Sequence, residues 1–226
     1  MGNHKFRAAL FDMDDTLIGR EAAYGDVYRA LYDGHDVIHS TTSWPDALEF
    51  FWSLSLGNMT DPQEAFVEIK KKWHAIAGDP DSHNTFYFEQ MVRLVQMIPG
   101  AMDFIDWMNS SSVSWGVVTN GDQFQHQKAE VTGIAIKARF VLASKLFGVD
   151  KPAPEVLVEA ARLLGVEGLE TEEILFVGDN PYTDIVGAHG VGMKTAWVRM
   201  GREYPDDAPA PDFIIDHVAE LKELLG

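Results

Sequence analysis

Cysteine is absent from the 226 residues of this chain. The chain can therefore form no disulfide bond and no thiolate metal site, and it has no cysteine nucleophile. This absence fits a reducing compartment. Any nucleophilic or metal chemistry must come from serine, threonine, histidine or carboxylate side chains.

Positive charge is scarce as well. The chain has 18 Lys and Arg residues against 35 Asp and Glu residues, which gives a formal net charge of -17. The summed field of such a chain repels polyanions, so nucleic acid and anionic membrane surfaces are not expected as partners. A phosphorylated substrate would need local cations that overcome this field.

Long apolar runs are also missing. No run approaches the roughly 20 residues that a helix needs to cross a bilayer. The N-terminus Met1-Gly2-Asn3-His4-Lys5 leads straight into an apolar segment rather than into a signal peptide. We therefore expect a cytoplasmic protein with no membrane partner, whereas its oligomeric state cannot be predicted.

An acidic cluster follows the first apolar segment of the chain. The run Ala8-Ala9-Leu10-Phe11 predicts a buried strand that stops abruptly at acidic residues. Side chains alternate faces in an extended segment, so Asp12 and Asp14 point the same way, about 6 to 7 Å apart. One metal ion or one small tetrahedral group fits that gap and would make two like charges tolerable. An acidic turn exposed to water explains the stretch equally well.

Residues 18 to 98 carry apolar side chains at helical spacing. The four stripes are Tyr24, Val27, Tyr28 and Leu31; Ala47, Leu48, Phe51 and Leu54; Phe66, Ile69, Trp73 and Ile76; and Phe88, Met91, Val95 and Ile98. Turn and cap residues such as Gly78-Asp79-Pro80 separate neighbouring stripes. The pattern predicts four amphipathic helices, inserted as a domain over residues 18–98. Their aromatic residues are expected to form its core.

From Pro99 onward, short apolar segments alternate with helical patterns. Strands are predicted at 115–119, 140–143, 174–178, 195–198 and 213–215, and helices at 100–109, 123–132, 154–164, 184–189 and 218–225. Such alternation implies a parallel sheet covered on both faces. The predicted fold class is α/β: a doubly wound, Rossmann-like parallel sheet formed by residues 1–17 and 99–226, with the four-helix domain inserted.

Open parallel sheets bind ligands at the carboxyl ends of their strands. The strand at 115–119 ends in Thr119-Asn120-Gly121, whose hydroxyl and backbone N–H groups can hold phosphate oxygens. An ordinary Asn-Gly turn also explains this segment. Lys151, next to Pro152, can offset crowded carboxylates and hold a phosphoryl oxygen, although most lysines are solvated at the surface.

The strand at 174–178 ends in a further acidic segment. Asp179 can ligate a cation, and Asp184 can complete the ligand shell directly or through water. With Asp12 and the carbonyl of Asp14 they offer oxygen ligands, which suit magnesium. Each aspartate taken alone is also explained as a residue that stabilises a helix N-terminus.

These four segments together resemble the ordered motifs of the haloacid dehalogenase-like superfamily. The motifs are Asp12-x-Asp14-x-Thr16, Thr119-Asn120, Lys151-Pro152, and Gly178-Asp179 with Asp184. The resemblance covers the whole chain, because those enzymes carry a doubly wound core with a helical cap inserted after the first strand. One departure is Asp15, where many members have glycine.

The resemblance implies a role for each motif residue. Asp12 would attack phosphorus and form an aspartyl-phosphate, and Asp14 would protonate the leaving group and then activate water. Lys151 and Thr119 would neutralise charge on the phosphoryl oxygens, while Thr16 would brace the loop. The magnesium ligands would be Asp12, Asp14, Asp179 and Asp184. The substrate-binding residues would be Asn120, Gly121 and Arg20.

The predicted function is a Mg²⁺-dependent phosphatase of a small phosphorylated metabolite of nucleotide, sugar phosphate or phosphoglycolate type. Dehalogenases of this fold lack the second acid, so Asp14 favours phosphoryl chemistry. Phosphonatases use a cap lysine soon after the first motif, and no lysine occurs between Lys5 and Lys70. A phosphomutase on the same core and a catalytically silent phosphate-binding regulatory module stay open as alternatives.

Overall fold

The central strand of the protein is β1 (Ala8–Phe11), all of whose residues are buried. A strand that is apolar on both faces is stable only where both faces are covered. In the computed structural model, which describes residues 6–55 and 61–226, β1 pairs in parallel with β2 (Ser114–Thr119) and β4 (Ile174–Gly178).

The strands of the described residues form one six-stranded parallel sheet in the order β3-β2-β1-β4-β5-β6. The outer strands are β3 (Val141–Ala143), β5 (Lys194–Val198) and β6 (Phe213–Ile215). This is the order of a doubly wound sheet, in which the direction of winding reverses between β1 and β4. The predicted α/β fold class is confirmed. The bounds of β2, β3 and β5 each differ from the prediction by one residue.

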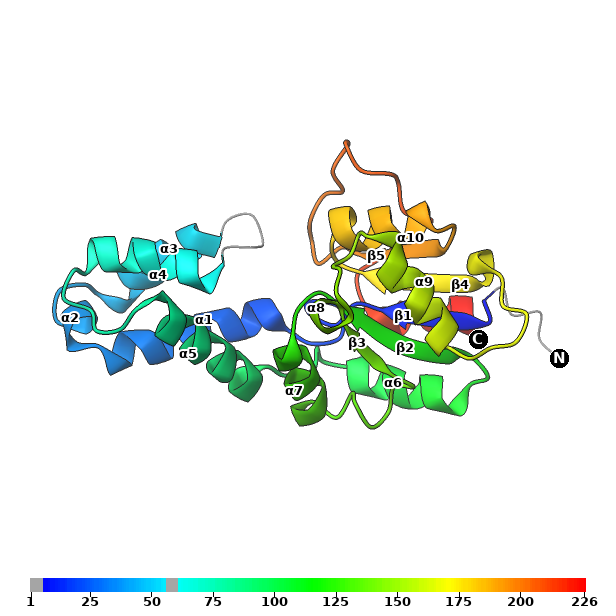
Figure 1. The fold of residues 1–226 in the computed structure, drawn as a ribbon, viewed down its shortest axis with the longest axis horizontal. Coiled ribbons are helices and arrows are strands. Elements are labelled where there is room, and N and C mark those ends of the chain that lie inside the picture. The colour runs from blue at the N-terminus through cyan, green and yellow to red at the C-terminus, as the bar shows by residue number, and fades with distance from the viewer. Residues whose placement is uncertain (1–5, 56–60) are drawn as a thin grey trace. The chain divides into compact units, whose positions relative to one another are not determined.

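Helices cover both faces of the sheet (Figure 1). On one face, α9 (Pro154–Leu163) and α10 (Val186–Gly190) share an apolar cluster with β1 and β4. On the other face lies α6 (Ala101–Ser110), where the Phe104 ring meets Phe11 edge-on at a centroid distance of 5.8 Å. Coverage of both faces explains why the strands are nearly continuous apolar runs.

Several shorter elements complete this part of the chain. They are α7 (Gln123–Val131), α8 (Ser144–Phe147), the 3-10 helices η1 (Thr171–Glu173) and η3 (Val218–Leu221), the π-helical turn η2 (Pro181–Ile185) and α11 (Lys222–Leu225). The helix predicted at 184–189 begins earlier, as η2, because the Asn180 side chain accepts hydrogen bonds from the N–H groups of Tyr182 and Thr183.

The chain divides into two compact units, one of Met1–Gly19 with Gln96–Gly226 and one of Arg20–Val95. The first contains the sheet, and the second is helical. The helices of the second unit are α1 (Arg20–Gly34), α2 (Asp36–His39), α3 (Trp44–Ser55), α4 (Pro62–Lys72) and α5 (Pro80–Leu94). The four longer helices carry most of the four predicted stripes, but Trp73 and Ile76 lie beyond the end of α4, and Val95 and Ile98 lie beyond the end of α5. The sequence pattern missed α2 because a single turn is too short to show a helical repeat.

The helical unit has its own aromatic core. Tyr28 of α1 stacks on Phe51 of α3 with ring centroids 4.5 Å apart, and Trp73 is buried against the same ring. The expectation that these aromatic residues form core is therefore confirmed for Phe51 and Trp73. Across the described residues of both units, none of the helices combines the length and the apolar character that crossing a membrane requires.

Candidate active site

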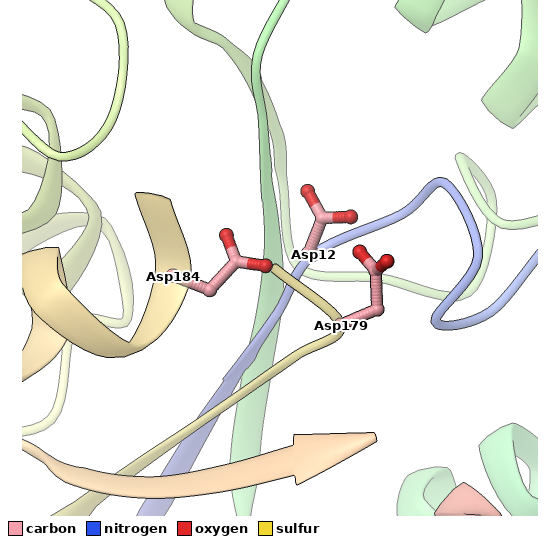
Figure 2. A group of neighbouring side chains, drawn as sticks. All are labelled: Asp12, Asp179 and Asp184. Atoms are coloured by element: carbon pink, nitrogen blue, oxygen red, sulfur yellow. The ribbon is translucent and has the colours of Figure 1, made fainter. Parts of the chain in front are cut away.

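Three aspartates converge beyond the carboxyl ends of the central strands. Asp12 follows β1, Asp179 follows β4, and Asp184 lies in η2. Each offers one carboxylate oxygen, and these oxygens all lie within 4.8 Å of one another. All three residues are buried, and their side chains point toward one another (Figure 2). The position between β1 and β4 is where a doubly wound sheet binds its ligands.

Lys151 is a buried cation that faces two of these acids, Asp12 and Asp184. Its ammonium donates hydrogen bonds to Asp12 Oδ1 at 2.6 Å and to Asp184 Oδ1 at 2.7 Å, and a third to the Val118 carbonyl at 2.8 Å. Its side chain is only 1% exposed. A buried ammonium is tolerated only when it is paired and fully hydrogen-bonded, so Lys151 belongs to the carboxylate cluster and not to the solvated surface.

Burial governs the electrostatics of this cluster. Burial raises the pKa of the Asp12 carboxyl well above its usual range; the Lys151 ammonium opposes that shift, and the Asp184 and Asp179 carboxylates add to it. Burial alone would lower the pKa of Lys151, but Asp12 and Asp184 outweigh it and raise that pKa. The three carboxylates outnumber the cations that contact them, which are Lys151 and, at Asp179, Arg202, and this excess favours a further cation.

The loop after β2 holds Lys151 in place. The Asn120 side chain donates to the Lys151 carbonyl at 3.0 Å and accepts from the Lys151 N–H at 2.8 Å. The Gly121 N–H donates to Ser144 Oγ at 3.1 Å. These groups, predicted to bind substrate, are thus engaged within the protein. Thr119 is buried at the end of β2, and its contact with a phosphoryl group stays a prediction.

Gly178 explains how Asp184 comes so close to β4. A Cβ at Gly178 would overlap the Asp184 carboxylate, so only glycine leaves room for that side chain. The carboxylate also accepts a hydrogen bond from the Asn180 N–H at 3.0 Å. The Gly178-Asp179-Asn180 segment and η2 together fix the position of Asp184, and π-helical turns of this kind often occur at functional sites.

Asp14 points to a different partner from the other acids. Its two carboxylate oxygens accept hydrogen bonds from the Lys128 ammonium at 2.7 and 2.6 Å. Gln125 Nε2 donates to Asp14 Oδ2 at 3.1 Å. The Asp14 side chain is outside the group of three converging aspartates, and its role as a carbonyl ligand of a metal stays a prediction. Lys128 and Gln125 were not predicted as site residues, although their Gln-x-x-Lys spacing places them on one face of a helix.

Asp15 and Thr16 are the two other polar residues of the first motif. Asp15 has a φ of 57°, in the left-handed region, which explains why glycine is common here and why aspartate is tolerated. Thr16 is buried, and its hydroxyl has no hydrogen-bond partner among the described residues. The predicted role of Thr16 as a brace of the loop stays a prediction.

Asp179 is held by two residues that the sequence analysis also missed. Arg202 Nη2 donates to Asp179 Oδ2 at 3.0 Å and to its carbonyl at 2.9 Å. The buried Trp197 donates from Nε1 to the same carbonyl at 2.8 Å. Arg20, predicted to contact substrate, begins α1 in the helical unit, and its role stays a prediction.

A doubly wound sheet with buried carboxylates and a paired lysine at its switch point has the position and the charged groups of an enzyme active site. The haloacid dehalogenase-like hydrolase family model matches residues 6–192. The chain belongs to that family and is a phosphoric monoester hydrolase of it.

Individual relatives extend this likeness over the whole chain. A glyceraldehyde 3-phosphate phosphatase from Methanopyrus kandleri is 33% identical, over 97% of this chain and 97% of the relative. An N-acetylmuramic acid 6-phosphate phosphatase from Pseudomonas aeruginosa is 26% identical, over 100% of this chain and 97% of the relative. The HAD-hydrolase YfnB from Bacillus subtilis, solved with bound magnesium, has the same fold, with a TM-score of 0.78 at 22% identity and coverage of 98% and 99%.

Proposed function

We propose that this protein is a Mg²⁺-dependent phosphatase that hydrolyses a small phosphorylated metabolite through an aspartyl-phosphate intermediate. The observation that carries the proposal is the position of Asp12. Its carboxylate lies beyond β1, with the Lys151 ammonium on one oxygen and Asp179 and Asp184 beside it. A carboxylate in this setting can act as a nucleophile while neighbouring cations take up the charge of a phosphoryl group.

The proposed reaction has two half-reactions. In the first, an Asp12 oxygen forms a bond to phosphorus, the bond between phosphorus and the leaving oxygen breaks, and Asp14 gives that oxygen a proton. In the second, a water oxygen attacks the same phosphorus, Asp14 takes up the proton of the water, and the Asp12–phosphorus bond breaks. The products are an alcohol and inorganic phosphate, and Asp12 and Asp14 return to their starting states.

The acidic cluster fits a magnesium ion. The ligand set of Asp12, Asp179 and Asp184 offers hard carboxylate oxygens close together, and the buried carboxylates exceed the charge of Lys151. We place the metal at these residues, with the carbonyl of Asp14 as a fourth ligand. When bound, the metal supplies positive charge for the phosphoryl oxygens.

The relatives support a choice of substrate class. Their names specify a triose phosphate and an amino-sugar phosphate, so we propose sugar phosphates ahead of nucleotides and phosphoglycolate. We also propose that the unit of residues 20–95 is the cap that selects the substrate, with Arg20 at its first helix contributing to that selection. The expected compartment is the cytoplasm.

Phosphate release tests this proposal. The purified protein is assayed against sugar phosphates, nucleotides and phosphoglycolate, with Mg²⁺ and with EDTA. We expect release of inorganic phosphate from at least one sugar phosphate, lost with EDTA and restored by excess Mg²⁺. Appearance of a phosphate isomer without free phosphate would instead identify a mutase, and no turnover of any ester with Mg²⁺ would identify a silent binding module.

A further inference from the structure

We infer that Lys128 and Gln125 of α7 are positioning residues that hold the Asp14 carboxylate in place for proton transfer. This inference rests on the proposed function. Three N–H···O contacts, two from Lys128 and one from Gln125, engage both Asp14 oxygens. A carboxylate held at both oxygens has one side-chain orientation, and proton transfer depends on such an orientation.

The burial of the Lys128 side chain supports this role. It is 6% exposed, and the Asp14 side chain is 15% exposed. A lysine on an exposed helix ordinarily extends its ammonium into water, and burying it costs several kcal/mol unless it is paired. Lys128 instead lies against Asp14, 114 residues away in the chain. The structure therefore pairs two acids of the site with two different buried lysines: Asp14 with Lys128, and Asp12 with Lys151.

Gln125 connects this contact to the loop that holds Lys151. Its Nε2 donates to Asp14 Oδ2 and, at 2.7 Å, to the Asn120 carbonyl. Its Oε1 is buried and has no hydrogen-bond partner in the described part of the chain, whereas its bonds to Asp14 and Asn120 both run through Nε2. The Asn120 side chain in turn binds the Lys151 backbone. One network thus fixes both the proton-transfer acid and the lysine beside the nucleophile.

Gly121 makes the network possible. Its φ is 139°, and a Cβ there would lie 2.8 Å from Gln125 Cγ and 2.8 Å from Gln125 Nε2. Glycine at this position lets Gln125 fold across the loop and reach Asp14. Gly121 was predicted to bring the backbone close to substrate; its observed neighbour is Gln125.

Loss of the network should impair both half-reactions. A mobile Asp14 would protonate the leaving oxygen poorly and would activate water poorly. A substrate with a good leaving group, such as p-nitrophenyl phosphate, needs no proton in the first half-reaction but still needs water activation in the second. The phosphorylated enzyme should therefore accumulate with that substrate, giving a burst of p-nitrophenolate.

The experiment compares wild type with Lys128→Met, Lys128→Arg and Gln125→Met. For Lys128→Met we expect kcat for the best sugar phosphate to fall about 10- to 100-fold while KM changes less than about threefold. With p-nitrophenyl phosphate we expect a burst near one equivalent per active site, absent from wild type. Gln125→Met, which leaves the ion pair intact, should lose less activity, and Lys128→Arg should recover part of the rate.

Lys145→Met is the matched control, because it removes the same charge from an exposed lysine of α8. It should keep the wild-type kcat and show no burst. Unchanged kcat in both Lys128→Met and Gln125→Met would overturn the inference. It would also be overturned if Lys128→Met lost activity without a p-nitrophenolate burst and Lys128→Arg recovered none of that activity. A wild-type protein that hydrolyses no phosphate ester would overturn the proposed function instead.

Discussion

The Lys151 ammonium lies 2.6 Å from Asp12 Oδ1 and 2.7 Å from Asp184 Oδ1, so one buried cation bridges the proposed nucleophile and a proposed metal ligand. The same ammonium compensates two buried carboxylates and lies beside the proposed nucleophile, so its loss should affect both stability and turnover. Any change that removes this charge leaves two buried acids without compensation.

Lys151→Met tests this link. We expect turnover to fall at least about 100-fold, because the charge on the phosphoryl oxygens would lose its lysine partner. Without metal, the unfolding free energy should drop by about 3 to 5 kcal/mol, the usual cost of leaving a buried charge unpaired. Mg²⁺ should then raise the thermal midpoint of the variant more than that of wild type, since the metal replaces the missing charge. Equal midpoint shifts in the two proteins would contradict this account.

Asp12→Asn separates chemistry from folding. Phosphate release should become undetectable, because an amide oxygen cannot form the phosphoenzyme. The metal-free protein should be no less stable than wild type, since the substitution removes a buried carboxyl whose pKa is raised by burial and, further, by repulsion from Asp184 and Asp179. Phosphate assays and urea unfolding with EDTA measure the two effects. Full activity in this variant would reject Asp12 as the nucleophile.

Gly178→Ala tests whether the site needs the close approach of Asp184 to β4. The new Cβ would overlap the Asp184 carboxylate, so that side chain must move. We expect a loss of about 1 to 3 kcal/mol in unfolding free energy and a weaker Mg²⁺ affinity by isothermal titration calorimetry. Gly190→Ala, where no atom lies within 4 Å of the added Cβ, is the control and should bind Mg²⁺ like wild type. Wild-type affinity in Gly178→Ala would show that Asp184 does not hold the metal.

The sequence was most informative where strands end. Asp12 and Asp179 follow buried apolar strands, and a parallel sheet brings such ends to one edge whatever the details of packing. Their meeting with Asp184 and Lys151 was therefore predictable from topology and motif order. The sequence also shows Gly121 and Gly178, but it does not show that the side chains of Gln125 and Asp184 lie against them.

The contacts of Lys128 and Arg202 were not predictable in the same way. Lys128 reaches Asp14 from α7, the helix that follows β2, and Arg202 reaches Asp179 from the segment between β5 and β6. Both contacts depend on tertiary paths that no local pattern encodes. In the sequence each residue is one of many charged residues expected to lie in water. The buried Thr16 hydroxyl, with no partner in the described residues, was equally hidden.

His83 should make the stability of the protein depend on pH. This residue of α5 is 3% exposed, its ring stacks on Phe66 at 4.9 Å, and its Nε2 has no hydrogen-bond partner within the described residues. Burial lowers the pKa of His83 from 6.5 to about 4, and nearby His35 adds to the shift. Between these two values the unfolded chain binds a proton that the folded protein excludes. The contribution of the neutral, buried His83 to the unfolding free energy is therefore fully present above pH 6.5 and is lost as the pH falls toward 4.

The His83→Phe variant isolates this contribution, because it keeps an aromatic ring and removes the titration. The gap between 6.5 and about 4 corresponds to about 3 kcal/mol of unfolding free energy. Between pH 7.5 and pH 4.5, wild type should lose about 2 to 3 kcal/mol more than His83→Phe in urea unfolding followed by circular dichroism. His74→Phe, at an exposed histidine of the same unit, should follow wild type. Parallel pH profiles for wild type and His83→Phe would mean that the folded protein admits the proton and that burial of this ring does not exclude it.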